Sequence, residues 1–410
     1  MGRRVGESLK RAARDVLDLT GRLVDKLGPR IFGSASCARA ADEIATELGR
    51  HCDTVRKERF SGRPGAFWHS TKVSSLAYIA GLFLLIVGGN LVYLSILFFL
   101  IILLEIVNFI FYSHLFDPFF PRVEGTNVIG VVEPAGPATQ QIFVVGHHDS
   151  TYIYTYFARL RKLYVFRIGA AYLFSLFGFC VSLLLGLYRL IDKSDPADRG
   201  VLLIILLAGL FFMVPVFFYM GRKGSPGAGD NLVACAMGIK IAERFGGVHA
   251  PKRLRRTRVI ILSTDGEEPG LLGAGSFARE HRDELLAVKT YVLNFDSIYR
   301  TRDLTALTKD RNGTIRLSAS MAADLHRTAG ELGHSIKVSS IPIFAGATDA
   351  ARFAEIGVEA SSIVGLPIPP IREELGFHTQ NDTVERIEPE AVEACLEIAY
   401  HYILDKDRLG

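Results

Sequence analysis

Cysteine is scarce in this sequence, and the few cysteines present form no recognisable pair. The 410 residues include five cysteines, an odd number, and no Cys-x-x-Cys motif. They are Cys37, Cys52, Cys180, Cys235 and Cys395. Scattered single cysteines argue against a disulfide scaffold and against a zinc site built from thiolates. Unpaired thiols are also typical of a reducing compartment.

Other familiar features are missing as well. The net charge is only +4 and no basic run is interleaved with aromatic residues, so we expect no nucleic-acid partner. The first 72 residues contain no apolar stretch of the kind found in a cleavable signal peptide. Residues 224–229 are rich in glycine but lack the Gly-Lys-Ser/Thr of a phosphate loop, which indicates a turn.

Long apolar runs, in contrast, are abundant, and hydrophobic residues make up 49% of the chain. Residues 73–112 contain a single charged side chain, Glu105. One helix of that length would measure about 60 Å, twice the hydrocarbon thickness of a bilayer. A tight turn at residues 88–90 would divide the run into two spans, 73–87 and 91–112, of which the first is short.

Two further apolar runs, 165–190 and 201–220, are joined by the polar segment 192–199. A buried core helix is the alternative interpretation of each run. Four runs of this length favour four transmembrane helices in two inserted hairpins. The sequence therefore predicts a multi-pass integral membrane protein with the lipid bilayer as a partner.

Basic residues beside the apolar runs predict the orientation, because they concentrate on the cytoplasmic side of membrane helices. The connections between the hairpins and the rest of the chain carry Arg56, Lys57, Arg59, Arg63, Lys72, Arg159, Arg161, Lys162, Arg222 and Lys223. The turns within the hairpins hold only Lys193 and Arg199. We therefore expect both termini and all the soluble mass on the cytoplasmic side.

The N-terminal region predicts two amphipathic helices. Residues 5–27 carry apolar side chains at helical spacing, with Arg and Lys between them, and Pro29 would end this helix. Such a helix can lie on a membrane surface or pack against its own protein. Residues 37–49 have the same pattern and stop at Gly49.

The remaining chain alternates strands with helices, which predicts an α/β three-layer sandwich around a mostly parallel mixed sheet. The expected strands are 127–133, 141–146, 258–264, 290–295, 337–342 and 360–366. The expected helices are 231–245, 271–283, 315–332, 348–356 and 388–404. The expected division is an N-terminal helix at 1–29, hairpins at 73–112 and 164–221, and one domain built from 30–72, 113–163 and 222–410.

Histidine and carboxylate side chains gather where expected strands end or helices begin. They are His147, Asp149, Asp230, Glu267, Glu268, Asp296 and His378. Singly, each has a plainer explanation: Asp230 can cap a helix, and adjacent acids on a loop are usually solvated. Together they should meet at one edge of one sheet. Mixed histidine and carboxylate ligands suit zinc, and one carboxylate can bridge two ions.

This ordered set resembles the M-28 family of peptidases in clan MH, the co-catalytic zinc aminopeptidases, whose relatives include glutamate carboxypeptidases, glutaminyl cyclases and the transferrin-receptor ectodomain. The matching segments are Gly146-His147-His148-Asp149-Ser150, Gly229-Asp230-Asn231, Gly266-Glu267-Glu268-Pro269-Gly270-Leu271, Asn294-Phe295-Asp296 and His378-Thr379-x-x-Asp382-Thr383. The resemblance covers about residues 30–404 without the two hairpins.

The resemblance implies two zinc ions bound by His147, Asp230, Glu268, Asp296 and His378. Asp230 would bridge the ions, Glu267 would be the general base, and Asp149 would orient His147. Asp382 would support the site, and His148 would form a pocket wall. The implied substrate is a peptide.

The hairpins are the departure from the family. The second hairpin lies within the 83 positions that separate His147 from Asp230. Its tethers, 14 residues after Ser150 and nine residues before Asp230, reach roughly 50 and 30 Å when fully extended. We therefore expect the catalytic mouth to lie close to the bilayer.

The leading hypothesis is a membrane-anchored two-zinc exopeptidase, an aminopeptidase that cleaves peptides with a metal-activated water. A carboxypeptidase or a glutaminyl-cyclase-like enzyme is the alternative within the enzyme class. A catalytically inactive receptor or scaffold is the alternative outside it, although here every ligand and the base are present. A transporter using Glu105 has only that one intramembrane acid in its favour. Substrate side chain, peptide length and oligomeric state are left open.

Overall fold

The structure is a computed structural model that describes residues 2–155, 163–192, 199–246, 253–368 and 376–409. The chain divides into two compact units. The first, here called the α/β unit, consists of Met1–Pro64, Arg122–Ile153 and Lys223–Gly410. The second, here called the helical unit, consists of Gly65–Pro121 and Tyr154–Arg222.

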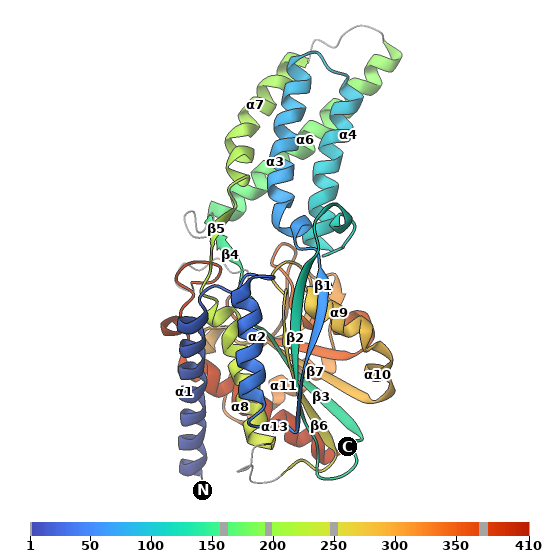
Figure 1. The fold of residues 1–410 in the computed structure, drawn as a ribbon. Coiled ribbons are helices and arrows are strands. Elements are labelled where there is room, and N and C mark those ends of the chain that lie inside the picture. Colours follow the sequence, from blue (N-terminus) through green and yellow to red (C-terminus); the bar gives the residue numbers. More distant parts are fainter. Residues whose placement is uncertain (1, 156–162, 193–198, 247–252, 369–375, 410) are drawn as a thin grey trace. The chain divides into compact units, whose positions relative to one another are not determined.

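A nine-stranded mixed sheet forms the centre of the α/β unit. Its strands are β1 (Thr54–Gly62), β2 (Val123–Val132), β3 (Gln140–His147), β6 (Thr257–Thr264), β7 (Lys289–Ile298), β8 (Thr305–Asp310), β9 (Ile315–Arg316), β10 (Lys337–Ser340) and β11 (Glu359–Gly365). The order is β1-β2-β6-β3-β7-β11-β8-β10, with β9 paired to β8. Figure 1 labels β1, β2, β3, β6 and β7 of this sheet. The central strands β6, β3, β7 and β11 are parallel, whereas β1, β2 and β8 add antiparallel pairs. The sheet is therefore mixed, and it is parallel only in its centre and in the β8–β10 pair.

Helices cover both faces of this sheet. One core cluster joins it to α1 (Gly2–Leu27), α2 (Ala35–Leu48), α8 (Val233–Gly246), α11 (Ala319–Glu331) and α13 (Pro389–Leu409). A second cluster joins the other face to α9 (Leu272–Glu280), α10 (Arg282–Ala287) and α12 (Ala350–Glu355). Because both faces are covered, the central strands carry apolar side chains on both sides. Successive side chains point to opposite faces, so Val144 of β3 packs in the first cluster and Phe143 in the second.

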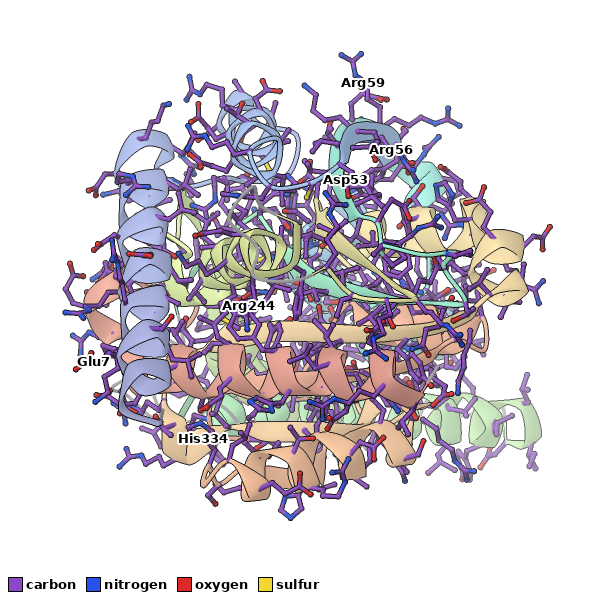
Figure 2. All side chains as sticks on the ribbon, turned by 90° about the horizontal axis from the view of Figure 1, so that it is seen from below. Glu7, Asp53, Arg56, Arg59, Arg244 and His334 are labelled. Atoms are coloured by element: carbon purple, nitrogen blue, oxygen red, sulfur yellow. The ribbon has the colours of Figure 1, made fainter. Side chains whose placement is uncertain are left out.

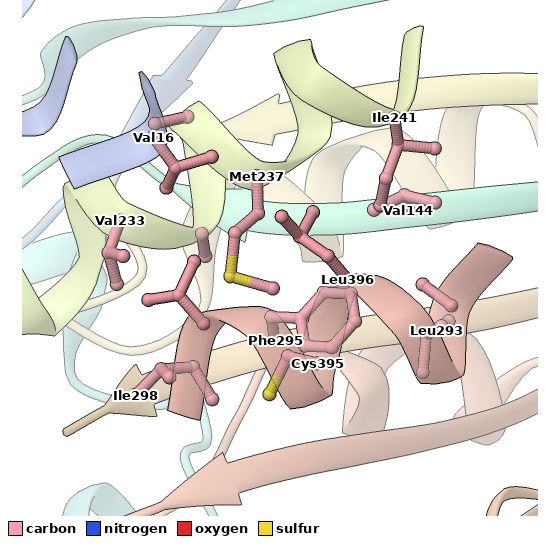
Figure 3. Packing of buried hydrophobic residues seen from close by; sticks show 14 of the residues in the cluster. Val16, Val144, Val233, Met237, Ile241, Leu293, Phe295, Ile298, Cys395 and Leu396 are labelled. Atoms are coloured by element: carbon pink, nitrogen blue, oxygen red, sulfur yellow. The ribbon is translucent and has the colours of Figure 1, made fainter. Parts of the chain in front are cut away.

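Figure 3 shows the first cluster from close by, with Met237 of α8 and Leu396 of α13 packed over Val144 and Leu293 of the sheet. These four side chains are at most 2% exposed. Burying a side chain of this size contributes about 1.5–3 kcal/mol. The predicted sandwich of helices and sheet is thus present in the α/β unit.

The N-terminal helix packs against its own protein. The apolar stripe of α1, including Leu9, Val16 and Leu23, is buried in the first core cluster. An ion pair of 2.7 Å between Lys240 of α8 and Asp15 adds a polar contact on the same helix. Of the two alternatives that the sequence left open, the structure therefore supports packing on the α/β unit, because the apolar stripe has no surface left for lipid.

Strand β1 was not expected from the sequence, since its middle reads Arg56-Lys57-Glu58-Arg59. It lies at the edge of the sheet, and Figure 2 shows Arg56 and Arg59 at the periphery of the protein. Charged residues on an edge strand discourage pairing with another chain. Strand β8 was also missed, because four of its six residues, Thr305, Thr308, Lys309 and Asp310, are polar.

Several predicted helix ends differ from those observed. The helix expected at 271–283 is interrupted at His281, where the backbone leaves the helical region and divides α9 from α10. The helix expected at 315–332 begins at Ala319, after Ser318, whose side chain accepts a hydrogen bond from the amide of Met321.

The helical unit contains four apolar helices: α3 (Gly65–Ile86), α4 (Leu91–Glu105), α6 (Leu163–Ile191) and α7 (Arg199–Val216). A short π-helical turn extends α4 to Ile110. All four are long and apolar enough to cross a membrane by length and composition. The prediction of a short first span was wrong, because α3 begins at Gly65 and has 22 residues.

The helical unit has an apolar interior and an apolar exterior. Tyr78 of α3 stacks edge-on against Phe98 of α4 and donates a hydrogen bond of 3.0 Å to the carbonyl of Leu206. On the outside, Phe83 is 64% and Phe211 67% exposed. Large exposed apolar surface of this kind marks an interface with lipid or protein. The basic residues Arg159, Arg161, Lys162 and Lys193 used for the orientation lie outside the described residues.

Candidate metal centre

The site begins at the carboxyl end of β3. His147 is the last residue of that strand and lies in parallel register with Thr264, the last residue of β6. On the other side of β3, β7 continues past the pairing of Val145 with Asn294 and presents Asp296. Parallel strands end at one edge of a sheet, so residues distant in the sequence meet there.

Asp230 reaches this edge from a tight backbone turn before α8. Gly227 has a φ of +64°, which favours glycine. A Cβ atom at Gly229 would lie 2.2 Å from the ring of Tyr299, so only glycine fits this position. The peptide bond between Asp230 and Asn231 is cis. The side-chain amide of Asn231 donates a hydrogen bond of 2.8 Å to the carbonyl of Phe295.

The two carboxylate oxygens of Asp230 face two different histidines. Oδ1 lies 3.3 Å from Nε2 of His147, and Oδ2 lies 3.0 Å from Nε2 of His378. His378 Nε2 is also 3.3 Å from Oε2 of Glu268. Asp230 is 4% exposed, so these contacts are buried. A carboxylate between two imidazoles is the arrangement that a bridging ligand requires.

Two groups of potential ligands result. His147, Glu267 and Asp296 each offer a donor atom within 4.8 Å of the others, and Asp230, Glu268 and His378 do the same. The structure thus brings together all five predicted ligands and the predicted base. Glu267 Oε2 is 3.7 Å from His147 Nε2, which is longer than the 3.0–3.3 Å between the histidines and the other carboxylates described above.

Asp149 fixes the loop that carries the two glutamates. Its Oδ1 accepts a hydrogen bond of 3.1 Å from the amide of Glu267, and its Oδ2 accepts one of 3.2 Å from the amide of Glu268. Oδ1 also lies 3.3 Å from Nδ1 of His147. One buried carboxylate therefore positions both the histidine and the loop, which is a broader role than orienting His147 alone.

Ser297 and Asp382 complete the surroundings of Asp230. The hydroxyl oxygen of Ser297 lies 3.1 Å from a carboxylate oxygen of Asp230 and 2.7 Å from one of Asp296, so its single proton is shared between these two acceptors. Asp382 accepts a hydrogen bond of 2.8 Å from the main-chain amide of Gly229, the residue that precedes Asp230. Asp382 therefore holds the turn that presents Asp230, in agreement with the supporting position expected for it.

The charges of the site shift the protonation of its members. Burial raises the pKa of Glu267 well above its ordinary value, against the opposing effect of His147. Burial also raises the pKa of Asp296 well above its ordinary value. For Asp230 burial acts in the same direction, but the two imidazoles outweigh it and lower its pKa. Burial disfavours a charged His378, yet the carboxylates of Glu268 and Asp230 raise its pKa to about 10.

These residues fit a divalent metal. Nε2 of His147 and Oε1 of Glu268 are buried and make no well-aligned hydrogen bond within the described part of the chain. A cation would bind to both atoms. Its positive charge would compensate the buried carboxylates, which otherwise depend on protons bound to the histidines and to the carboxylates themselves. Histidine nitrogen with carboxylate oxygen is a donor set that zinc accepts. The donor atoms that fit such a cation come from His147, Asp230, Glu268, Asp296 and His378.

Sequence reasoning missed two residues near the site. Arg30 is fully buried and binds the carbonyls of His148 and Gly227. Asp349 is 1% exposed, accepts a hydrogen bond from Thr264 and adds negative charge beside Glu267. Arg30 stands at neither an expected strand end nor an expected helix start. Asp349 stands at the start of the expected helix 348–356, where an aspartate is more simply explained as a helix cap.

His148 does not form the pocket wall that was expected. Its side chain has no exposed surface, and its Nδ1 lies 2.9 Å from the hydroxyl of Ser263. The ring is directed into the interior, because alternation along the chain sends His147 and His148 to opposite sides.

The comparisons with known proteins agree with this arrangement. The model of Peptidase family M28 matches residues 214–403, a range that contains Asp230, Glu267, Glu268, Asp296 and His378 but not His147. No curated protein matches the sequence.

Solved structures share the fold. A Zn-dependent exopeptidase from Parabacteroides distasonis is 14% identical, with a TM-score of 0.55 over 96% of this chain and 98% of that chain. Porphyromonas gingivalis glutaminyl cyclase is 13% identical, with a TM-score of 0.56 over 96% and 98%. A leucine aminopeptidase precursor from Bacteroides thetaiotaomicron is 11% identical, with a TM-score of 0.54 over 96% and 97%. The family match supports a hydrolase, and these neighbours show the α/β fold of zinc exopeptidases.

Proposed function

We propose that this protein is a membrane-anchored exopeptidase with two zinc ions, and that it acts as an aminopeptidase. The observation that carries the proposal is the placement of Asp230 between His147 and His378, each with further carboxylates beside it. One ion would need a single set of ligands, whereas this chain provides two sets that share one carboxylate. The number of ions and the aminopeptidase specificity are parts of the proposal.

Two zinc ions in this cluster would polarise the scissile carbonyl and lower the pKa of a water molecule. The protein provides the proton transfers. Glu267 would accept the proton of the attacking water at a carboxylate oxygen and donate it to the nitrogen of the departing amine. Asp149 keeps Glu267 in place through the amide that it binds.

The test is mass spectrometry of a diverse peptide mixture after incubation with detergent-purified, zinc-loaded protein. We expect loss of single N-terminal residues with the wild type and no loss with Glu267→Gln, which keeps the shape of the side chain. Loss of single C-terminal residues would refute the aminopeptidase and leave a carboxypeptidase. Absence of cleavage with two zinc ions bound would refute the exopeptidase and favour the receptor or scaffold.

Glutaminyl cyclase activity is the second candidate, because several of the structures with this fold are glutaminyl cyclases. The same mixture should contain peptides that begin with glutamine. Cyclisation releases ammonia and leaves the peptide bonds intact, so the peptide loses mass without losing a residue. The two reactions are thereby separated in one measurement.

The membrane anchor is the remaining part of the proposal. The four apolar helices would span the bilayer with the α/β unit on the cytoplasmic side, supported by their length, composition and flanking basic residues. The native thiols Cys37 and Cys395 cannot report the orientation, because they are 1% and 0% exposed. Lys10→Cys places a thiol at an exposed position of α1. A maleimide that cannot cross the membrane should label this thiol in opened cells only. Labelling in intact cells would show that the α/β unit faces the outside.

A further inference from the structure

A second cluster of metal-ligating side chains lies outside the residues assigned to catalysis. Cys37 of α2, His148 after β3 and Asp265 after β6 each offer a donor atom within 4.8 Å of the others. All three are buried, with exposures of 1%, 0% and 2%. A thiol, an imidazole and a carboxylate rarely meet by chance in an apolar interior, since each loses hydration there.

The distances suit a tetrahedral ion. Sγ of Cys37 is 3.1 Å from Oδ1 of Asp265, and Nε2 of His148 is 3.9 Å from Oδ2 of the same carboxylate. Zinc bonds of about 2.0–2.3 Å to nitrogen, oxygen and sulfur place tetrahedral ligands roughly 3.3–3.8 Å apart. The observed separations bracket that range, so small shifts of side chains would close the site.

One atom of the cluster indicates what is missing. Nε2 of His148 is buried and makes no hydrogen bond within the described residues, although Nδ1 of the same ring is held by Ser263 at 2.9 Å. The ring is thus fixed in orientation with its other nitrogen directed toward Asp265 and left unsatisfied. Fixing one nitrogen while the other binds a metal is how proteins orient a ligating histidine.

We propose that Cys37, His148 and Asp265 bind a third zinc ion, which has a structural role. Binding replaces the proton on the Cys37 thiol, and that proton leaves to the buffer. Three protein ligands leave one tetrahedral position, which a water molecule fills. The sequence argued against a thiolate zinc site because no two cysteines are close. The proposed site uses one cysteine with ligands 111 and 228 positions away, a spacing that no short motif shows.

The position of the cluster explains what the ion would do. Asp265 stands two residues before Glu267, and His148 follows His147 directly. Cys37 is in the first turn of α2, a helix capped by Ser34. The ion would therefore connect α2 to both loops that carry catalytic residues. It binds no substrate, so these are positioning residues.

The test replaces zinc by cobalt(II), because a thiolate bound to cobalt gives a charge-transfer absorption in the near ultraviolet. The proposed catalytic ligands are only nitrogen and oxygen, so this absorption reports the third site alone. We expect the absorption in the wild type and in Cys395→Ala, which removes a buried thiol that belongs to none of the potential ligand groups among the described residues. We expect none in Cys37→Ser, together with one fewer bound zinc per chain.

His148→Asn provides the second variant, because an amide can keep the bond to Ser263 while Nε2 is lost. We expect it to fold and to bind the third ion at least tenfold more weakly. Glu267→Gln should lose hydrolysis and keep the absorption, which separates this inference from the proposed function. Absence of the absorption in cobalt-loaded wild type, or equal zinc content in wild type and both variants, would overturn the third site. The cluster would then be a hydrogen-bonded contact only.

Discussion

Replacement of Arg30 by methionine should destabilise the α/β unit and weaken its metal site. The guanidinium is fully buried and donates hydrogen bonds to four carbonyls, those of Gly28, His148, Pro226 and Gly227, at 2.7–2.9 Å. No carboxylate lies within ion-pair distance of it among the described residues. Burial lowers the pKa of Arg30, whereas the main-chain dipoles and the more distant carboxylates of Asp382 and Asp149 compensate part of its charge.

The magnitude follows from these four bonds. Hydrogen bonds to a charged group contribute about 1.5–3 kcal/mol each, but burying the guanidinium cancels much of their sum. Methionine fills part of the volume and leaves four acceptors without their donor, so we expect a loss of about 3–5 kcal/mol. Two of the carbonyls belong to His148 and Gly227, which flank His147 and Asp230. We therefore also expect weaker zinc binding, by about tenfold or more.

The assay is thermal unfolding of the detergent-solubilised protein followed by circular dichroism, with zinc affinity measured by competition with a chelator. The expected loss corresponds to a decrease in Tm of at least about 5 °C. Arg327→Met is the matched control, because Arg327 is 51% exposed and its ion pair with Glu331 lies at the surface, where such pairs add little stability. An Arg30→Met protein with the Tm and zinc affinity of the control would refute the reasoning.

Three further predictions concern the carboxylates. Glu267→Gln should lower kcat by about 10²–10⁴ while zinc content, measured by elemental analysis, stays unchanged, because only proton transfer is lost. Asp149→Asn should weaken zinc binding by about 10–100-fold in a chelator titration. The asparagine side chain has only one acceptor oxygen, so it cannot accept hydrogen bonds from the main-chain N–H groups of both Glu267 and Glu268 in the way that the two carboxylate oxygens do. Asp407→Asn should cost about 1–3 kcal/mol at pH 7 in thermal unfolding, since Asp407 accepts three main-chain N–H bonds at the start of β6. Burial opposes the charge of Asp407, but those hydrogen bonds lower its pKa in the folded protein. Its contribution to the free energy of unfolding is therefore present above about pH 4 and is lost as the pH falls through the pKa of the folded state. A difference in stability between the variant and the wild type that persists unchanged at low pH would contradict this.

The sequence allowed the centre of the sheet to be predicted because that centre is apolar on both faces. Strands β3, β6 and β7 are short β-branched runs that end in polar residues, and this pattern has few other interpretations. The edge strand β1 has the opposite character. Its charges keep it soluble, and they also remove the hydrophobic signal on which strand prediction depends.

The metal centre could be predicted for a related reason. His147, Glu267 and Asp296 follow strands whose carboxyl ends meet, so the order of the chain already places them together. Arg30 and Asp349 contribute through contacts between segments that no strand order brings together. Asp349, for instance, reaches Thr264 across 85 positions of sequence. Such contacts depend on how loops pack, and loop packing is not encoded in periodicity.

The insertion of the helical unit into the α/β unit also has a physical explanation in the strand pairing. The first helical segment leaves β1 after Gly62 and returns to β2 at Val123, and these two residues are partners in the antiparallel register. The second leaves by β4 (Tyr152–Tyr154) and returns by β5 (Met220–Gly224), which pair with each other. Each insertion therefore starts and ends on neighbouring strands that are hydrogen-bonded. Because the entropy of closing a loop grows only with the logarithm of its length, paired ends let long helical hairpins enter the chain without disturbing the sheet or the residues at its carboxyl edge.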